Sequence, residues 1–284
     1  MYEILDKEKI ARNSYRMKIE APYIAEERQP GQFVILSVHG EYGERIPLTI
    51  VDSDTDEGSI TVIFQVVGYS TDELSKLNPG DSLPVLLGPL GNPTHIGKIG
   101  HVVCVGGGIG VAPLYPITKA LYEAGNTITA ILGAQTKELL ILQNEMQALS
   151  RETIVCTDDG SYGREGVVTG PLGEVCEQQS RPDLVVAIGP PVMMKFCAET
   201  TRPYGIKTMV SLNTIMVDGT GMCGGCRVNV GGETKFVCVD GPEFDGHEGA
   251  FDEMINRLSA YTEKEKQTHE EKPHSGCCLE GERR

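Results

Sequence analysis

The chain has 284 residues, of which 40% are hydrophobic and 23% are charged, a profile typical of a globular protein with room for two domains and a small module. Its formal net charge of −15 argues against nucleic acid and against an anionic membrane as partners, because both attract basic surfaces. No segment approaches the roughly 18 apolar residues of a membrane span, and the charged N-terminus does not resemble a signal peptide, so we expect a cytoplasmic protein.

Residues 1–97 predict an antiparallel β-barrel or sandwich. Segments that alternate or run apolar recur about every ten residues, with Pro and Gly turns between them. These segments are "SYRMKIEA", "GQFVILSV", "RIPLTIVDSD", "GSITVIFQVV" and "DSLPVLLGPLG".

Residues 98–205 have a different rhythm, in which buried strands alternate with helices. The strands "HVVCVGGGIG", "TITAILGA", "ETIVCTDDGS" and "DLVVAIG" are almost continuously apolar. Strands of this kind are buried on both faces, so the segment predicts a parallel, doubly wound sheet. Helices are expected at 111–125, 136–149, 170–179 and directly after Pro190.

The stretch "VGGGIGVAPL", residues 105–114, follows a buried strand and opens a helix. Glycines at such a turn let backbone N–H groups approach a pyrophosphate at the helix N-terminus. The spacing GGGxG departs from G-x-G-x-x-G, and no acidic residue follows about twenty positions later. A tight strand-to-helix turn without a ligand is therefore an alternative at this point.

Two further polar loops begin where strands should end, "TDDGSYGREG" at Thr157 and "GPPVMM" at Gly189. Ligands of open parallel sheets gather outside the carboxyl ends of the strands, so the three loops together predict a nucleotide crevice. The residues expected to line it are Gly106, Gly107, Gly108, Ile109, Gly110, Thr157, Asp158, Asp159, Gly160, Gly189, Pro190 and Met193.

Residues 206–250 contain Cys223, Cys226 and Cys238 among many glycines. Clustered thiols in a reducing compartment are metal ligands more often than disulfides, and zinc and an iron–sulfur cluster are both open. Asp218 and Asp240 compete for the fourth position. Residues 251–284 predict a helix and a polar tail, in which Cys277 and Cys278 are accessory.

The order of segments resembles the ferredoxin–NADP reductase superfamily, whose barrel binds a flavin and whose α/β domain binds a nicotinamide nucleotide. The strand "RIPLT" fits the flavin motif of that superfamily, "GYST" fits its next flavin loop, and "GPLGNP" fits the turn that closes the barrel. An arginine fork also suits a pyrophosphate on chemical grounds. The resemblance implies that FAD is held by Arg45, Pro47, Leu48, Thr49, Gly68, Ser70 and Thr71.

With the cysteine-rich segment added, the chain resembles the electron-transfer subunit of dihydroorotate dehydrogenase. It resembles still more the small (alpha) subunit of NADH-dependent ferredoxin–NADP oxidoreductase, also known as a sulfide dehydrogenase subunit. The resemblance implies a FAD-binding barrel at 1–97, an NAD(P)-binding domain at 98–205 and a [2Fe–2S] module at 206–250. Asp218 takes the place of the first cysteine in a C-x4-C-x2-C…C pattern, ahead of Cys223, Cys226 and Cys238.

The same resemblance implies that electrons move between NAD(H), FAD and the cluster without a catalytic acid or base. It implies a large partner subunit with a second FAD and [4Fe–4S] clusters, and ferredoxin reached through an electron-bifurcating complex. NADH is expected rather than NADPH, because "GAQTKE" offers only Lys137 to a 2′-phosphate. The alternatives are the dihydroorotate dehydrogenase subunit and a zinc-containing, nucleotide-binding redox sensor.

Overall fold

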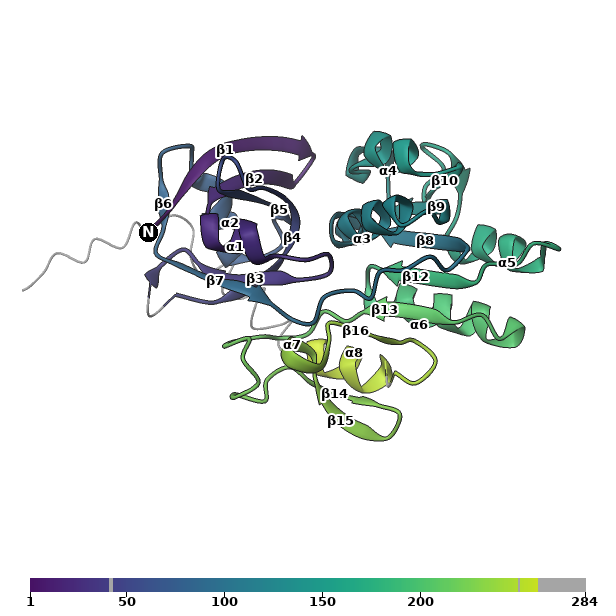
Figure 1. Cartoon of the computed structure of the whole chain (residues 1–284). Helices are drawn as coiled ribbons and strands as arrows, with labels where there is room; N and C mark the ends of the chain where they lie inside the picture. The colour runs from purple at the N-terminus through teal and green to yellow at the C-terminus, as the bar shows by residue number, and fades with distance from the viewer. Residues whose placement is uncertain (41–42, 250, 260–284) are drawn as a thin grey trace, which may run out of the picture.

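The computed structural model describes residues 1–40, 43–249 and 251–259. A barrel and an α/β sheet lie side by side, and a small C-terminal part lies against both (Figure 1). Among the described residues, no helix is both long enough and apolar enough to cross a membrane.

The N-terminal part is a seven-stranded antiparallel sheet in the order β6-β1-β2-β5-β4-β3-β7. Strands β6 and β7 follow one another in the chain but end opposite sides of this order, so the sheet curls into a nearly closed barrel, as predicted. Its elements are β1 (Tyr2–Ala11), β2 (Ser14–Glu20), α1 (Pro22–Glu27), β3 (Phe33–Ser37), β4 (Ile46–Asp54), β5 (Ser59–Gln65), α2 (Tyr69–Lys76), β6 (Ser82–Leu83) and β7 (Val85–Leu90).

The second sheet has the order β11-β10-β9-β8-β12-β13-β16 and is parallel except for β16, which confirms the predicted parallel fold. Its strands are β8 (His101–Gly107), β9 (Thr127–Ala134), β10 (Glu152–Thr157), β11 (Arg164–Glu165), β12 (Leu184–Ile188), β13 (Thr208–Ser211) and β16 (Glu243–Asp245). Its helices are η2 (Gly108–Gly110), α3 (Val111–Glu123), η3 (Lys137–Leu139), α4 (Gln143–Leu149), α5 (Thr169–Glu177), α6 (Pro191–Thr201) and η4 (Arg202–Tyr204).

Alternation along β8 explains why the strand is apolar throughout. Val102 and Cys104 belong to the buried core that contains Leu114 of α3. Val103 and Val105 belong to the core on the other face, with residues of α5 and α6. Successive side chains of a strand point to opposite faces, so a strand covered by helices on both faces needs apolar residues at every position.

The helix predicted at 136–149 is wrong over its first half. The chain forms the short 3₁₀ turn η3 there, and α4 begins only at Gln143. Leu142 has a φ of 51°, a left-handed conformation that no helix interior accepts. Ile141 and Leu142 are both buried in the core under α3, so the apolar run serves packing at a turn and not one face of a helix.

The C-terminal part contains the hairpin β14 (Arg227–Val230) and β15 (Glu233–Phe236), with α7 (Val237–Asp240) and α8 (Phe251–Ser259). Val228, Val237 and Phe251 are buried in the same core as Val210 of the parallel sheet. Two strands of this segment, β13 and β16, also extend that sheet. The segment therefore shares a core with its neighbour, and the boundaries drawn at 97, 205 and 250 stay predictions.

The barrel meets the α/β sheet through an apolar contact with ion pairs beside it. Val51 and Ile63 of the barrel lie in the core that contains Leu114. Lys119 of α3 pairs with Asp52 at 3.8 Å, and Arg16 of β2 pairs with Glu145 of α4 at 3.1 Å. Exposed pairs of this kind stabilise little, so the apolar contact dominates this junction.

A second junction joins the barrel to β16 through the segment that follows β7. The Thr94 backbone N–H donates to Pro30 O at 2.8 Å, and its hydroxyl donates to the Glu243 carboxylate at 2.5 Å. Burial raises the pKa of Glu243 from its ordinary value of 4.5 to about 7, although the Thr94 hydrogen bond opposes the shift.

This raised pKa predicts a pH dependence of stability. The native state holds the Glu243 proton up to about pH 7, whereas the unfolded chain releases it near pH 4.5, so stability is lost as the pH rises between these values. At about 1.4 kcal/mol per pKa unit the full loss is on the order of 3 kcal/mol. Urea unfolding of wild type and Glu243→Gln at pH 4.5 and pH 8 should show the variant gaining on the wild type at the higher pH. An identical difference at both pH values would contradict the raised pKa.

Candidate functional site

The barrel presents the residues of the "RIPLT" strand along β4. Pro47 pairs with Ile35 of β3, and Thr49 pairs with Phe33. Arg45, Pro47, Leu48 and Thr49 are all half-buried. In the part of the chain that the structure describes, no hydrogen bond or ion pair engages the Arg45 side chain, so its guanidinium is available to an anion.

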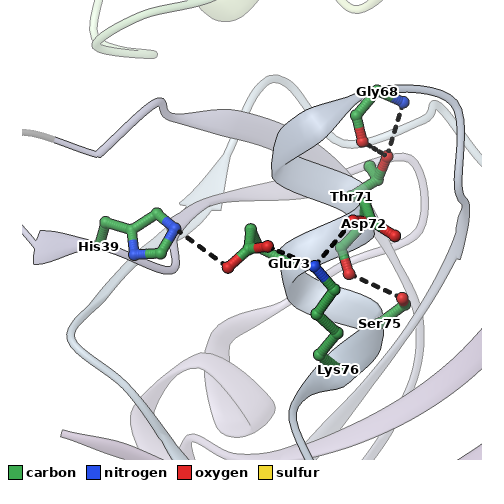
Figure 2. Close-up of polar contacts among 7 residues, drawn as sticks. All are labelled: His39, Gly68, Thr71, Asp72, Glu73, Ser75 and Lys76. Atoms are coloured by element: carbon green, nitrogen blue, oxygen red, sulfur yellow. Dashed lines mark hydrogen bonds and ion pairs between the residues drawn. The ribbon is translucent and has the colours of Figure 1, made fainter. Parts of the chain in front are cut away.

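The "GYST" loop forms the start of α2, directly beside this strand. The Thr71 hydroxyl accepts hydrogen bonds from the N–H groups of Val67 at 3.0 Å and Gly68 at 3.1 Å, and donates to Gly68 O at 3.0 Å (Figure 2). The Ser70 hydroxyl donates to the carboxylate of Glu44, which precedes Arg45 in the chain. The structure therefore brings the two barrel motifs together, although Thr71 is occupied in shaping its own loop.

Ion pairs hold the outer face of α2. Lys76 pairs with Glu73 at 2.6 Å and with Asp72 at 2.9 Å, and His39 lies 3.7 Å from Glu73 (Figure 2). His39 belongs to the segment that precedes Arg45. The contact of His39 with Glu73 joins α2 to that segment a second time, whereas the Lys76 pairs lie within the helix.

The glycine loop of β8 and the loop after β12 are in direct contact. A Cβ placed on Gly110 would lie 2.4 Å from Ile188 O and 2.6 Å from Gly189 Cα. A Cβ on Gly107 would lie 2.3 Å from Met193 Sδ. Only glycine permits this approach, which brings the two loops together at the carboxyl ends of β8 and β12, next to the start of α3.

The third predicted loop, Thr157–Gly160, ends β10 at the same edge of the sheet. Strand β9 separates β10 from β8, so this loop lies about 10 Å from the glycine loop across two strand spacings. The Thr157 side chain is fully buried, and its hydroxyl donates to Tyr162 O at 2.7 Å. Thr157 therefore shapes the loop, while Asp158 is exposed beside the crevice.

Ser161 and Tyr162, for which the sequence predicts no role, connect this loop to the segment that follows β9. The Asp159 carboxylate accepts hydrogen bonds from the hydroxyl and the N–H of Ser161, and these lower the pKa of Asp159. The Lys137 ammonium lies 5.3 Å from the ring centroid of Tyr162. Lys137, which was the only cation expected near a 2′-phosphate, is thus engaged with an aromatic ring.

Two of the three clustered cysteines are buried together. The Cys226 thiol donates to Cys238 Sγ at 3.2 Å, and both side chains lie in the core shared with the parallel sheet. Two thiolates on one tetrahedral metal with bonds of about 2.3 Å would lie about 3.8 Å apart, so this pair needs only a small adjustment to share an ion. Burial, followed by the neighbouring Cys226, raises the pKa of Cys238 to about 12. Its thiolate therefore needs a cation at its side.

Asp218 and Cys223 form a second pair on the exposed loop. The Asp218 carboxylate accepts hydrogen bonds from Thr220 N at 2.9 Å and Cys223 N at 2.8 Å, and these lower its pKa. Asp218 therefore caps a turn of this loop. Capping does not exclude a ligand role, because a carboxylate has about four lone-pair sites.

The structure does not gather the four predicted ligands around one point. Across residues 1–40, 43–249 and 251–259, no three His, Cys, Asp or Glu side chains converge in a way that could hold a metal ion. The rival ligand Asp240 accepts a hydrogen bond from Phe236 N at 2.6 Å, within its own turn. Cys277 and Cys278 lie outside the described residues. The donor set of three thiols and a carboxylate on glycine-rich turns nevertheless fits iron by its chemistry.

The cysteine loop packs directly on the barrel. A Cβ placed on Gly219 would lie 2.5 Å from Ile35 Cδ1 and 2.8 Å from Leu90 Cδ1. Ile35 is the strand partner of Pro47 in the "RIPLT" motif. The residue after Asp218 thus touches the neighbour of the predicted flavin strand, a proximity that no local sequence pattern announces.

Two family models match the chain. Residues 104–199 match an oxidoreductase NAD-binding domain. Residues 213–248 match the iron–sulfur cluster binding domain of dihydroorotate dehydrogenase B. These matches confirm the predicted nicotinamide domain and identify the cysteine-rich segment as an iron–sulfur module.

Relatives and solved structures agree with the models. The chain is 49% identical to the dihydroorotate dehydrogenase B (NAD(+)) electron transfer subunit homolog of Thermotoga maritima. The alignment covers 94% of this chain and 94% of the relative. It is also 48% identical to a chain in the structure of an NADH-dependent reduced ferredoxin–NADP oxidoreductase studied for flavin-based electron bifurcation. The TM-score is 0.89, over 95% of this chain and 97% of the other.

A ferredoxin NADP+ reductase from Neisseria gonorrhoeae, solved with bound FAD and NADP, shares the fold alone. Its TM-score is 0.57 at 17% identity, over 72% of this chain and 91% of the other. The predicted resemblance to the ferredoxin–NADP reductase superfamily is confirmed. The cofactors are FAD, an iron–sulfur cluster and NAD(H), and the protein is an oxidoreductase.

The contact at Gly110 predicts that Gly110→Ala damages nucleotide binding. The added methyl group would meet the backbone of Ile188 and Gly189, which cannot yield without moving the loop after β12. We expect overpacking to cost about 1–3 kcal/mol of stability and NADH binding to weaken about tenfold. Thermal unfolding and NADH titration measure the two effects.

Gly170→Ala is the matched control, because Gly170 lies in α5 and a Cβ there meets nothing within 4 Å. It should leave NADH affinity unchanged. Equal NADH affinities for Gly110→Ala, Gly170→Ala and wild type would remove the glycine loop from the nucleotide site.

Proposed function

Since the chain belongs to the family of dihydroorotate dehydrogenase B electron-transfer subunits, we propose that it carries electrons from NADH through FAD and a [2Fe–2S] cluster to a larger partner subunit. The contact of Gly219 with Ile35 carries this proposal. It brings the cysteine loop to the barrel strand that pairs with the flavin motif, so the two redox groups are neighbours.

Within the proposal, the FAD pyrophosphate binds the free guanidinium of Arg45 and the α2 N-terminus, and the flavin lies along Pro47, Leu48 and Thr49. Gly68, Ser70 and Thr71 shape the loop that closes this site. When bound, the nicotinamide supplies a hydride to the flavin, which releases its two electrons singly to the cluster. Protein groups orient these cofactors, and no side chain is required as an acid or base.

The nicotinamide nucleotide is assigned to the crevice at the carboxyl ends of β8, β12 and β10. Gly106–Gly110 would cradle the pyrophosphate, with Gly189, Pro190 and Met193 on one side and Thr157–Gly160 on the other. Engagement of Lys137 with Tyr162 supports NADH over NADPH, because a 2′-phosphate would have to draw that lysine away.

For the cluster, we assign Asp218, Cys223, Cys226 and Cys238 as the ligand set. Two of these ligands, Cys226 and Cys238, come from the buried core. The other two, Asp218 and Cys223, come from the exposed loop. Thiolate ligands of this kind suit a reducing compartment, which supports a cytoplasmic location.

The partner would be a large subunit with a second FAD and [4Fe–4S] clusters, through which ferredoxin is reached. Four apolar residues in the cysteine-rich segment have exposed side chains, and that of Met222 is 88% exposed. They are Ile215, Val217, Met222 and Val239. Large exposed apolar side chains beside a redox site suit a subunit interface.

Two pathways fit these cofactors. An electron-bifurcating NADH-dependent ferredoxin–NADP oxidoreductase is favoured by the 48% identity and TM-score of 0.89 to such a structure. The second candidate is a dihydroorotate dehydrogenase, favoured by the homolog from Thermotoga maritima. A zinc-containing redox sensor is disfavoured, because residues 213–248 match an iron–sulfur model.

Purification of the complex tests the function. Iron, acid-labile sulfide and FAD should be present in the chain, and NADH should reduce its flavin faster than NADPH does. With the partner bound, NADH and reduced ferredoxin together should reduce NADP, each supplying one of the two electrons per NADP, and NADH should not reduce orotate. Zinc without iron or flavin would refute the proposal, and orotate turnover would select the second pathway.

Arg45→Ala should lower FAD occupancy without unfolding the chain. Among the described residues, no hydrogen bond or ion pair engages the Arg45 side chain. Its loss therefore removes a charge-assisted bond to the pyrophosphate of about 1.5–3 kcal/mol, or more than tenfold in affinity. Flavin absorbance per chain and FAD titration measure it. Arg181→Ala, which removes an exposed arginine of the α/β domain, is the control. Unchanged FAD affinity in Arg45→Ala would exclude Arg45 from the site.

Asp218→Ala and Asp218→Cys separate a ligand from a turn cap. If Asp218 binds iron, Asp218→Ala should lose the cluster, and Asp218→Cys should keep it with a shifted paramagnetic resonance spectrum and a lower potential, because thiolate donates more charge. If Asp218 only caps the turn, both variants keep the wild-type spectrum and potential and lose about 1 kcal/mol of stability. Iron content, resonance spectra and potentiometry decide between them.

A further inference from the structure

Asn92 connects the barrel to the segment that follows Cys238. Its side-chain Nδ2 donates to Val239 O at 3.0 Å, and its backbone N–H donates to Gly241 O at 2.7 Å. Val239 is the residue directly after Cys238. One asparagine outside the cysteine-rich segment therefore holds two carbonyl groups next to a proposed iron ligand.

The segment around Asn92 is itself fixed to the barrel. The Gln32 side chain donates to Gly91 O at 2.9 Å, and Thr94 N donates to Pro30 O at 2.8 Å. A Cβ placed on Gly91 would lie 2.7 Å from Phe33 Cε1 and 3.1 Å from Pro242 Cδ. The chain at Gly91 is thus in contact with the barrel and with the segment after Cys238 at once.

The contact at Asn92 is separable from the core. Asn92 is exposed, whereas Thr94 and the neighbouring Glu243 hold the buried part of the same junction. Removing the Asn92 side chain therefore leaves the buried hydrogen bonds in place. What it frees is the Val239 carbonyl, in the turn that carries Cys238.

We propose that Asn92 is a positioning residue that holds the Cys238 end of the cluster site at a fixed place relative to the flavin barrel. The inference rests on the proposed function. Two electrons from each NADH pass singly from flavin to iron, and this transfer depends on the separation of the two sites. Asn92 contributes to that separation, since residues 91–94 bond to Gln32 and Pro30 ahead of β3 and to Val239 and Gly241 after Cys238.

The test uses the purified complex with wild type, Asn92→Ala and Asn92→Asp. Asp has the shape of Asn but no donor for Val239 O, so it tests the hydrogen bond and not the volume. Stopped-flow absorbance follows flavin reduction by NADH and then cluster reduction, and paramagnetic resonance and potentiometry describe the reduced cluster.

Flavin reduction should be unchanged in both variants, because the nicotinamide crevice lies elsewhere. Cluster reduction should slow several-fold, because the rate of electron transfer falls steeply as the separation of flavin and cluster grows. The resonance spectrum of the cluster should change as well, because the Cys238 turn loses a fixed hydrogen bond.

Asn78→Ala is the matched control. Asn78 is also exposed, and its Nδ2 donates to Lys76 O at 3.1 Å, within the barrel and away from the cysteines. It should behave as wild type. If Asn92→Ala and Asn92→Asp contain flavin and iron, reduce the cluster at the wild-type rate and give the wild-type spectrum, the inference is wrong. The proposed function would then still stand. A wild-type complex without flavin or iron would overturn the proposed function and the inference with it.

Discussion

The arrangement of the molecule depends on one constraint, which is that residues 206–249 are too few and too rich in glycine to bury a core of their own. Their strands β13 and β16 extend the parallel sheet, and their side chains Val228 and Val237 lie in its core. Cys226 and Cys238 lie in that same core. Cys226 and Cys238 are therefore positioned by the core of the nucleotide domain, whereas Cys223 is exposed. The loop that carries Asp218 packs on the barrel at Gly219.

Much of this fold could be predicted because its signals are local. Period-two strands with Pro and Gly turns gave the barrel, and continuously apolar strands alternating with helices gave the parallel sheet. The glycine loop was recognisable because close backbone approach requires glycine, and Gly107 and Gly110 do make such approaches. The prediction of a helix over 136–149 was wrong over its first half, because the apolar residues there have a different cause. Its apolar residues follow the demands of a buried turn at Leu142, which a helical periodicity count cannot distinguish from an amphipathic face.

The sequence nominates site residues, and their roles stay predictions. Cysteine spacing nominates ligands, yet it cannot show that Cys226 and Cys238 are buried as a pair while Asp218 and Cys223 share an exposed turn. Nor does it reveal that Thr157 and Thr71 use their hydroxyls to close their own loops. These hydrogen bonds join residues only three to twelve positions apart. They depend on the backbone turn and the side-chain orientation at each position, which residue types and spacing do not specify.

The motif "GPLGNP" is only partly the turn that its local sequence predicts. Gly88–Leu90 belong to strand β7, and the chain leaves the barrel only from Gly91 onward. In three dimensions its last residues face the cysteine-rich segment, where Asn92 bonds to Val239 and Gly241 and Gly91 approaches Pro242. A glycine is needed at Gly91 because two segments meet there, and not only because a turn needs one; its φ of 79° adds the second reason. Residues placed at the border of two domains thus satisfy constraints from both. An electron-transfer chain depends on such borders, because its rate is set by how its sites are held relative to one another and not by either site alone.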